Sequence, residues 1–169
     1  MELLKYFAAE QIDRGIYSPA MNEVLNLIIE NKMNRIAMEG CLAKFQVSIE
    51  QLKLEAFSIV FQYADECLND DILSDEEMRT IGLLKLFFHI EDGDFIKYGK
   101  KDAVKNILSR QLRKMYSDDI IDVNEAIQKT KLQELFGLSY DEFLEYVNSI
   151  AQESIKRGGD IHNLDTIII

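Results

Sequence analysis

Two clusters of acidic residues are the part of this 169-residue sequence whose types and spacing could support chemistry. Each cluster places two consecutive aspartates a few residues before further carboxylates. Hard cations such as Ca²⁺ and Mg²⁺ take about six or more oxygen ligands, and two such loops brought together could supply them. The candidate ligands for a divalent cation (Ca²⁺, Mg²⁺ or Zn²⁺) are Asp70, Asp71, Asp75, Glu77, Asp118, Asp119, Asp122 and Glu125.

The same carboxylates also fit a structural role. Acidic residues complement the dipole at a helix N-terminus, and a Ser or Asp three residues before a Glu forms a capping box. That spacing occurs at Ser74-x-x-Glu77, Asp122-x-x-Glu125 and Ser139-x-x-Glu142. Helix capping alone and capping combined with cation binding both remain open at this point.

Residue patterns for catalysis are missing from the sequence. His89 and His162 have no carboxylate or thiol at a telling spacing, and Cys41 and Cys67 are isolated from each other and from histidine. The sequence has no nucleophile elbow, phosphate-binding glycine loop or zinc-protease motif. We therefore expect no enzymatic activity, and metal-assisted phosphate hydrolysis is the least favoured alternative. His89 is predicted to end a helix, and both thiols to be buried at helix ends.

Charge is unevenly distributed along the chain, whose formal net charge is −11. Residues 65–94 hold ten acidic and two basic residues, whereas residues 97–114 hold seven basic residues and one acidic residue. The net charge argues against nucleic-acid binding, which depends on Lys and Arg neutralising phosphates. The basic segment either lies beside the acidic loops and offsets their repulsion, or forms a surface for a phosphate or a protein partner.

Apolar residues recur at the three- and four-residue spacing of amphipathic helices through most of the chain. One proline and eight glycines are too few for the turns of a sandwich or barrel. These features predict an all-α fold, a bundle of about seven helices that forms a single domain over residues 1–169. The region from Ile36 to Val47 is the hardest to assign. The apolar stripes begin at Met21, Ile49, Met78, Ala103 and Tyr140.

A 48-residue shift superposes two stretches of the sequence. Residues 70–74 fall on residues 118–122, and further positions downstream match in chemistry. Weaker copies of this loop lie at residues 14–18 and 159–163, and three turns that start with phenylalanine repeat at residues 45–48, 88–91 and 136–139. We infer an internal duplication with halves of roughly residues 13–93 and 94–160, followed by a tail, 161–169.

The repeated loop resembles the signature of the TerB-like family of tellurite-resistance proteins. Asp70 and Asp118 take the family's aspartate position, Ser74 and Asp122 its capping position, and Glu77 and Glu125 its glutamate position. The resemblance spans roughly residues 13–160. It implies an all-helical fold with repeated acidic loops that bind divalent cations, and a non-enzymatic role in stress response or complex assembly.

The sequence departs from that signature at the family's glycine position. Asp71 and Asp119 stand there, while Gly15 keeps the glycine in a loop that has lost its aspartate. Asp tolerates a left-handed backbone better than most residues, so we expect the turn to survive.

The ends of the sequence bear on location and partners. The N-terminus lacks the pattern of a signal peptide, and no apolar run approaches the roughly 20 residues that span a bilayer. We expect a cytoplasmic protein with a protein partner or self-association. The apolar residues 166–169 either pack on the bundle or dock a partner. A metal-free interaction module, using the acidic loops and the basic helix, is the alternative to cation binding.

Overall fold

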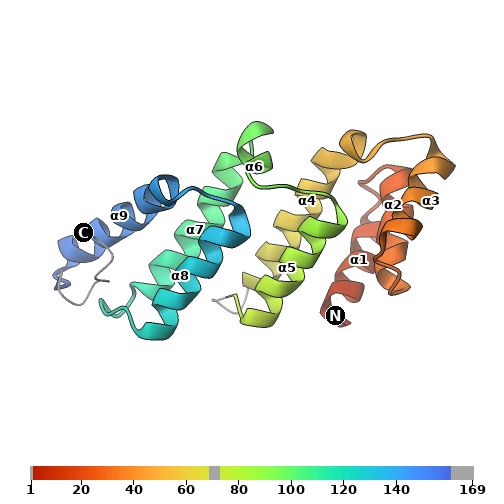
Figure 1. Ribbon diagram of the computed structural model, residues 1–169. Coiled ribbons are helices and arrows are strands. Elements are labelled where there is room, and N and C mark those ends of the chain that lie inside the picture. Colours follow the sequence, from red (N-terminus) through yellow and green to blue (C-terminus); the bar gives the residue numbers. More distant parts are fainter. Residues whose placement is uncertain (1, 69–72, 161–169) are drawn as a thin grey trace. The chain divides into compact units, whose positions relative to one another are not determined.

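Amphipathic segments fold into α-helices along the whole described chain. The computed structural model describes residues 2–68 and 73–160, and every regular element in these ranges is a helix (Figure 1). The all-α class is therefore confirmed. The helices are α1 (Glu2–Arg14), α2 (Pro19–Ile29), α3 (Arg35–Phe45), α4 (Ile49–Cys67), α5 (Asp75–Phe87), α6 (Asp94–Lys97), α7 (Lys101–Met115), α8 (Val123–Phe136) and α9 (Tyr140–Arg157).

The number of helices in the described ranges is nine, rather than about seven. Four of them, α1, α3, α6 and α8, lie outside the five apolar stripes of the sequence. Helix α1 buries a polar residue, Gln11, beside Leu4, Phe7 and Ala8, which interrupts its apolar pattern. Helix α6 is a single turn of four residues, too short to show a period. Helix α3 occupies the region that was hardest to assign.

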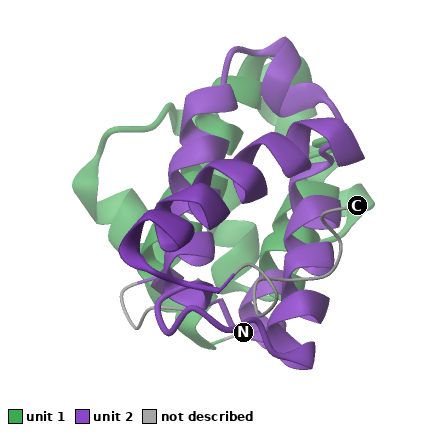
Figure 2. Cartoon of the chain, turned by 90° about the vertical axis from the view of Figure 1, so that its left-hand side faces the viewer, with its two compact units in different colours: residues 1–66, 79–91 green, residues 67–78, 92–169 purple. Residues whose placement is uncertain are grey.

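The chain divides into two compact units (Figure 2). The first comprises residues 1–66 and 79–91, and the second residues 67–78 and 92–169. In the first unit α2 packs on α1 and α3, and the ring centroids of Phe7 and Tyr63 lie 5.3 Å apart. In the second unit α7 packs on α8 and α9, and Phe95 and Phe136 lie 6.0 Å apart. Each unit thus has its own aromatic core.

The three predicted capping boxes are present at the starts of their helices. Ser18 caps α2 with Pro19 in the first turn, and α8 and α9 both begin with a capping box. Ser74 and Glu77 form the same reciprocal bonds before α5, over 2.8 and 3.3 Å. The last described helix ends at Gly158 in the left-handed conformation. These local signals were read correctly because each depends on residues only three or four apart.

The three turns that start with phenylalanine share one backbone structure. In each, the residue after the phenylalanine is left-handed, with φ of 55° at Gln46, 52° at His89 and 59° at Gly137. Two consecutive N–H groups donate back to carbonyls of the last helical turn, which is the Schellman motif. The bonds, 2.8–3.2 Å long, run from Gln46 to Ala43, Val47 to Leu42, His89 to Leu86, Ile90 to Lys85, Gly137 to Glu134 and Leu138 to Gln133.

Glycine is required at only one of these three turns. A methyl group on Gly137 would lie 2.6 Å from Oδ1 and 2.9 Å from Cα of Asp92. Gln46 and His89 adopt the same backbone with side chains that are exposed. A left-handed residue with a side chain costs roughly 1–2 kcal/mol, so the first two turns carry strain that the third avoids.

We expect Gln46→Gly to raise the free energy of unfolding by about 0.5–1 kcal/mol, because glycine removes the left-handed strain and this gain exceeds its chain entropy cost. Urea unfolding measures the change. The matched control is Gln46→Ala, which shortens the side chain but keeps the Cβ and should give no gain. Equal effects of the two variants would contradict the strain argument. Gly137→Ala should destabilise the protein.

Candidate functional site

The first acidic loop is described only at its two flanks, since Asp70 and Asp71 lie outside the described residues. On one side Arg110 Nη2 donates to the Leu68 carbonyl over 3.4 Å. On the other, the Leu73 N–H donates to Gln111 Oε1 over 3.0 Å. Both flanks of this loop are therefore hydrogen-bonded to residues in the middle of the basic helix α7. This position agrees with the first interpretation of the basic segment, in which it lies beside the acidic loops.

The two described candidate ligands after this loop already have partners. Glu77 accepts from the N–H of Ser74 over 2.8 Å and from its hydroxyl over 2.7 Å, as part of the capping box. Asp75 lies in the first turn of α5 and pairs with Lys131 Nζ of α8 at 2.7 Å. The carboxylate of Glu77 therefore caps a helix, and that of Asp75 forms an ion pair with a lysine.

The second acidic loop is closed by hydrogen bonds around Asp119. This residue is left-handed, with φ of 61°, so the turn expected at Asp119 is present. The hydroxyl of Ser154 donates to its carboxylate, and Arg157 Nη2 lies 3.3 Å from Oδ1. The same Arg157 atom donates to the carbonyl of Tyr116 over 3.0 Å. These bonds tie the loop to the last turns of α9.

The other three carboxylates of this loop bind backbone N–H groups. Asp118 accepts from the N–H of Ile120 over 3.1 Å, which forms an Asx turn. Asp122 accepts from the N–H of Glu125 over 2.8 Å, and Glu125 accepts in return from that of Asp122 over 3.0 Å. Each of these contacts stabilises the loop or the start of α8 without any cation.

The candidate ligands are not assembled into a metal centre by the described residues. Among residues 2–68 and 73–160, no group of three or more His, Cys, Asp or Glu is placed to hold a metal ion. The arrangement that the structure shows is a set of helix caps, one Asx turn and two lysine or arginine pairs. Helix capping is therefore present at Glu77, Asp122 and Glu125.

The basic helix α7 is also partly engaged inside its own unit. The guanidinium of Arg113 binds Glu153 of α9 through two bonds, from Nε over 3.2 Å and from Nη2 over 3.3 Å. This contact lowers the pKa of Glu153. Lys101 and Lys105 are exposed near the start of the helix. The two arginines of α7, Arg110 and Arg113, therefore both make contacts inside the second unit.

An exposed apolar surface on α8 was missed by the sequence analysis. Ile120, Val123 and Ile127 are 52, 76 and 49% exposed. Val123 and Ile127 are four residues apart and share one helix face, while Leu132 and Phe136 are buried on another face. Apolar residues on two faces of one helix are the signal that could have revealed it. We call Ile120, Val123 and Ile127 the α8 apolar surface.

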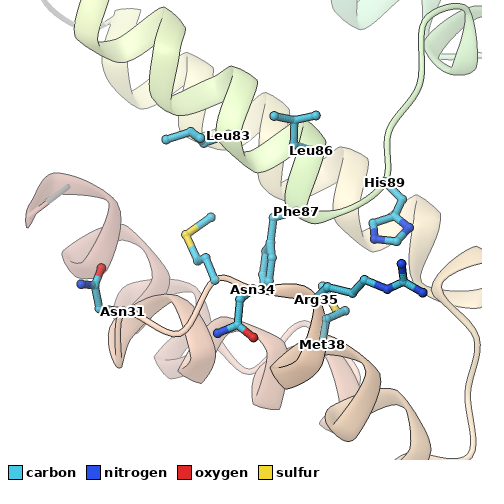
Figure 3. A pocket seen from close by; sticks show the side chains of 9 residues that line it. Asn31, Asn34, Arg35, Met38, Leu83, Leu86, Phe87 and His89 are labelled. Carbon is cyan, nitrogen blue, oxygen red and sulfur yellow. The ribbon is translucent and has the colours of Figure 1, made fainter.

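A cleft in the first unit is the second candidate binding site. It has a volume of about 410 Å³ and lies between the α2–α3 connection, the start of α3 and the end of α5 (Figure 3). The side chains of Arg35 and His89 lie at one end, and Asn31 lies toward the other. The lining residues are Asn31, Met33, Asn34, Arg35, Met38, Leu83, Leu86, Phe87 and His89.

Two of the polar side chains of this cleft, those of Asn34 and Arg35, already have partners within the fold. Asn34 Oδ1 accepts from the N–H of Ala37 over 3.0 Å and so caps α3. Arg35 Nε donates to Glu39 over 2.6 Å within the same helix. His89 stands at the left-handed end of α5, as the sequence predicted. The cleft is therefore an apolar hollow with few polar groups available to orient a ligand.

The surroundings of the Cys41 thiol are those of an unreactive cysteine. Cys41 and Cys67 are both buried. Burial, and then the charge of Glu23, raise the pKa of the Cys41 thiol, which disfavours the reactive thiolate. Cys67 ends α4 as predicted, but Cys41 lies in the middle part of α3, where it donates to the Ala20 carbonyl over 3.7 Å. His162 lies outside the described residues.

Comparisons with known proteins leave the site to be interpreted from its geometry. No family model, curated protein or solved structure matches the chain. In the ranges that the structure describes, no helix combines the length and the apolar character needed to cross a membrane.

We expect Asp119→Asn to lower the free energy of unfolding near pH 7, and the difference to narrow near pH 3. The bonds from Ser154 and Arg157 lower the pKa of Asp119. A carboxyl group with a lowered pKa stabilises the fold above its unfolded value of about 3.9, and this contribution is lost as the pH falls through the folded-state pKa. Urea unfolding at both pH values measures it.

The matched control for this prediction is Asp118→Asn, at the neighbouring position. Asp118 accepts only a backbone N–H among the described contacts, and Asn can accept the same bond. A loss in Asp119→Asn that is equal at both pH values would show that the ionised form of Asp119 is not what stabilises the loop.

Proposed function

We propose that this chain is a non-enzymatic cytoplasmic module that binds a protein partner without a metal ion, in stress response or complex assembly. The binding surface is the α8 apolar surface together with the acidic loop before it. The proposal rests on the exposure of Ile120, Val123 and Ile127 within about two helical turns. A cluster of large apolar side chains in water favours association with another surface.

The hydrogen bonds of the acidic loop support the metal-free form of this proposal. Asp122 and Glu125 are committed to the first turn of α8, and Asp119 to Ser154 and Arg157. A cation would have to compete with these bonds for the same oxygens. In this proposal the hydrogen bonds fix the conformation of the loop, and Ile120 is exposed next to the start of α8.

We also propose that the protein contains an internal duplication and that it is related to TerB-like proteins. Helices α5 and α8 begin 48 residues apart, at Asp75 and Val123, and α4 and α7 end 48 residues apart, at Cys67 and Met115. The left-handed residues Gly15 and Asp119, with φ of 66° and 61°, are each followed by an exposed isoleucine. The repeated backbone geometry supports a common origin for these loops.

Cation binding at the acidic loops is the second candidate function. One observation favours it: Asp118 is exposed and accepts one N–H, with no ion pair among the described residues. Its carboxylate, with that of Asp70 in the matching loop, is the group on which a Ca²⁺, Mg²⁺ or Zn²⁺ ion would depend.

We expect titration calorimetry of chelator-stripped protein with Ca²⁺, Mg²⁺ or Zn²⁺ to show no saturable heat, because the described carboxylates already bind internal donors. The Asp70→Asn/Asp118→Asn variant is titrated in parallel. Saturable heat in the wild-type protein that disappears in this variant would reassign the loops as a cation site. Heat that persists in the variant would place the ion elsewhere.

The second test locates the partner surface. We expect Val123→Gln/Ile127→Gln to lose at least about 90% of partner capture in a buffer with EDTA, since glutamine keeps the helix but removes the apolar contacts. Quantitative mass spectrometry of captured proteins measures the change. Leu54→Gln is the control, because it removes an exposed leucine from α4. Equal losses in both variants, or capture abolished by EDTA, would overturn the proposal.

A further inference from the structure

Three carboxylates surround the α8 apolar surface. Asp118 lies two residues before Ile120 and Asp122 directly before Val123. Glu134 follows Ile127 by seven residues, two turns along the same face. All three are exposed. They form a negatively charged border at both ends of the apolar side chains.

None of the three border carboxylates forms an ion pair among the described residues; Arg157 pairs instead with Asp119, next to Asp118. Asp118 and Asp122 accept only backbone N–H groups, which leaves their charge in place, and Glu134 has no ion pair there. The nearest cation along the helix face is Lys131, which is already paired with Asp75 at 2.7 Å. Lys129 is buried against Tyr116, over 3.1 Å from Nζ to the hydroxyl.

The negative charge of the border determines which kinds of macromolecule could bind the apolar surface. A second copy of the same surface would bring two negative borders together, and anionic lipid or nucleic acid would also be repelled. A partner with Lys or Arg around an apolar stripe would meet opposite charges and bury its apolar residues at the same time.

The length of the surface fits a helix. Val123 and Ile127 are separated by about one helical turn, and Ile120 precedes Val123 by three residues, so the apolar residues are spaced by three, four and seven. An amphipathic partner helix presents apolar residues at spacings of three, four and seven, which match this length. We propose, resting on the function proposed above, that the α8 apolar surface binds a cationic amphipathic helix of a partner protein.

Synthetic helical peptides of about four turns test this inference on the full chain. They share leucines at spacings of three, four and seven residues and carry Lys, Gln or Glu at all other positions. Fluorescence anisotropy of labelled peptides gives the affinities. We expect the Lys peptide to bind more tightly than the Gln peptide, and the Glu peptide most weakly.

The border carboxylates are then neutralised with their hydrogen bonds kept. In Asp118→Asn/Asp122→Asn/Glu134→Gln, asparagine still forms the Asx turn and the helix cap. We expect the Lys peptide to lose affinity roughly tenfold, since three border charge pairs each contribute modestly, while the Gln peptide is unaffected. A control variant, Asp13→Asn/Glu66→Gln/Asp102→Asn, changes the net charge equally at exposed acids elsewhere.

The outcomes separate this inference from the proposed function. Equal losses in the border and control variants would show that only the net charge attracts the peptide, and would overturn the inference. It is also overturned if the three peptides bind alike, or if the Lys peptide fails to bind. In those cases the proposed function still stands if Val123→Gln/Ile127→Gln reduces partner capture, and it fails if that variant captures normally.

Discussion

The unpaired N–H groups at the start of each helix are the constraint on which this structure depends. Every helix leaves such donors in its first turn, and they need an acceptor when water cannot reach them. This chain meets that need with Ser18, Asn34, Asp122 and Ser139, whose side chains accept from the first turns of their helices. Carboxylates such as Glu77 and Glu125 complete the caps. Several of the candidate ligands, Glu77, Asp122 and Glu125, are therefore parts of helix starts.

Local features of this fold could be predicted from the sequence, whereas contacts between distant residues could not. The Ser139–Glu142 cap depends on a spacing of three and was predictable, as was the left-handed backbone at Asp119. The bond from Ser154 to Asp119 joins residues 35 apart, and no local pattern signals it. The exposure of Val123 depends on which face of α8 packs on its neighbours. For the same reason, the internal partners of Asp75 and Asp119 could not be predicted from the sequence.

Helix α8 combines a structural and an exposed role in one element. Its buried side carries Leu132 and Phe136, and its first turn is held by the box between Asp122 and Glu125. The opposite side presents Val123 and Ile127 to solvent. Because the cap and the buried side fix the helix independently of the exposed side, the exposed residues are free to serve recognition. The cleft in the first unit lacks this separation, since Asn34 and Arg35 at its border also support α3.

The chain passes between its two compact units after residues 66, 78 and 91. Neither unit is a continuous segment, and α5 begins in one and ends in the other. During synthesis the first unit cannot be completed until residue 91 has emerged from the ribosome. At that point residues 67–78 have been made, but residues 92–169, which form the second unit with them, have not. Folding domain by domain from the N-terminus is therefore restricted in this protein. A cut at any single point of the backbone therefore leaves at least one of the two units incomplete.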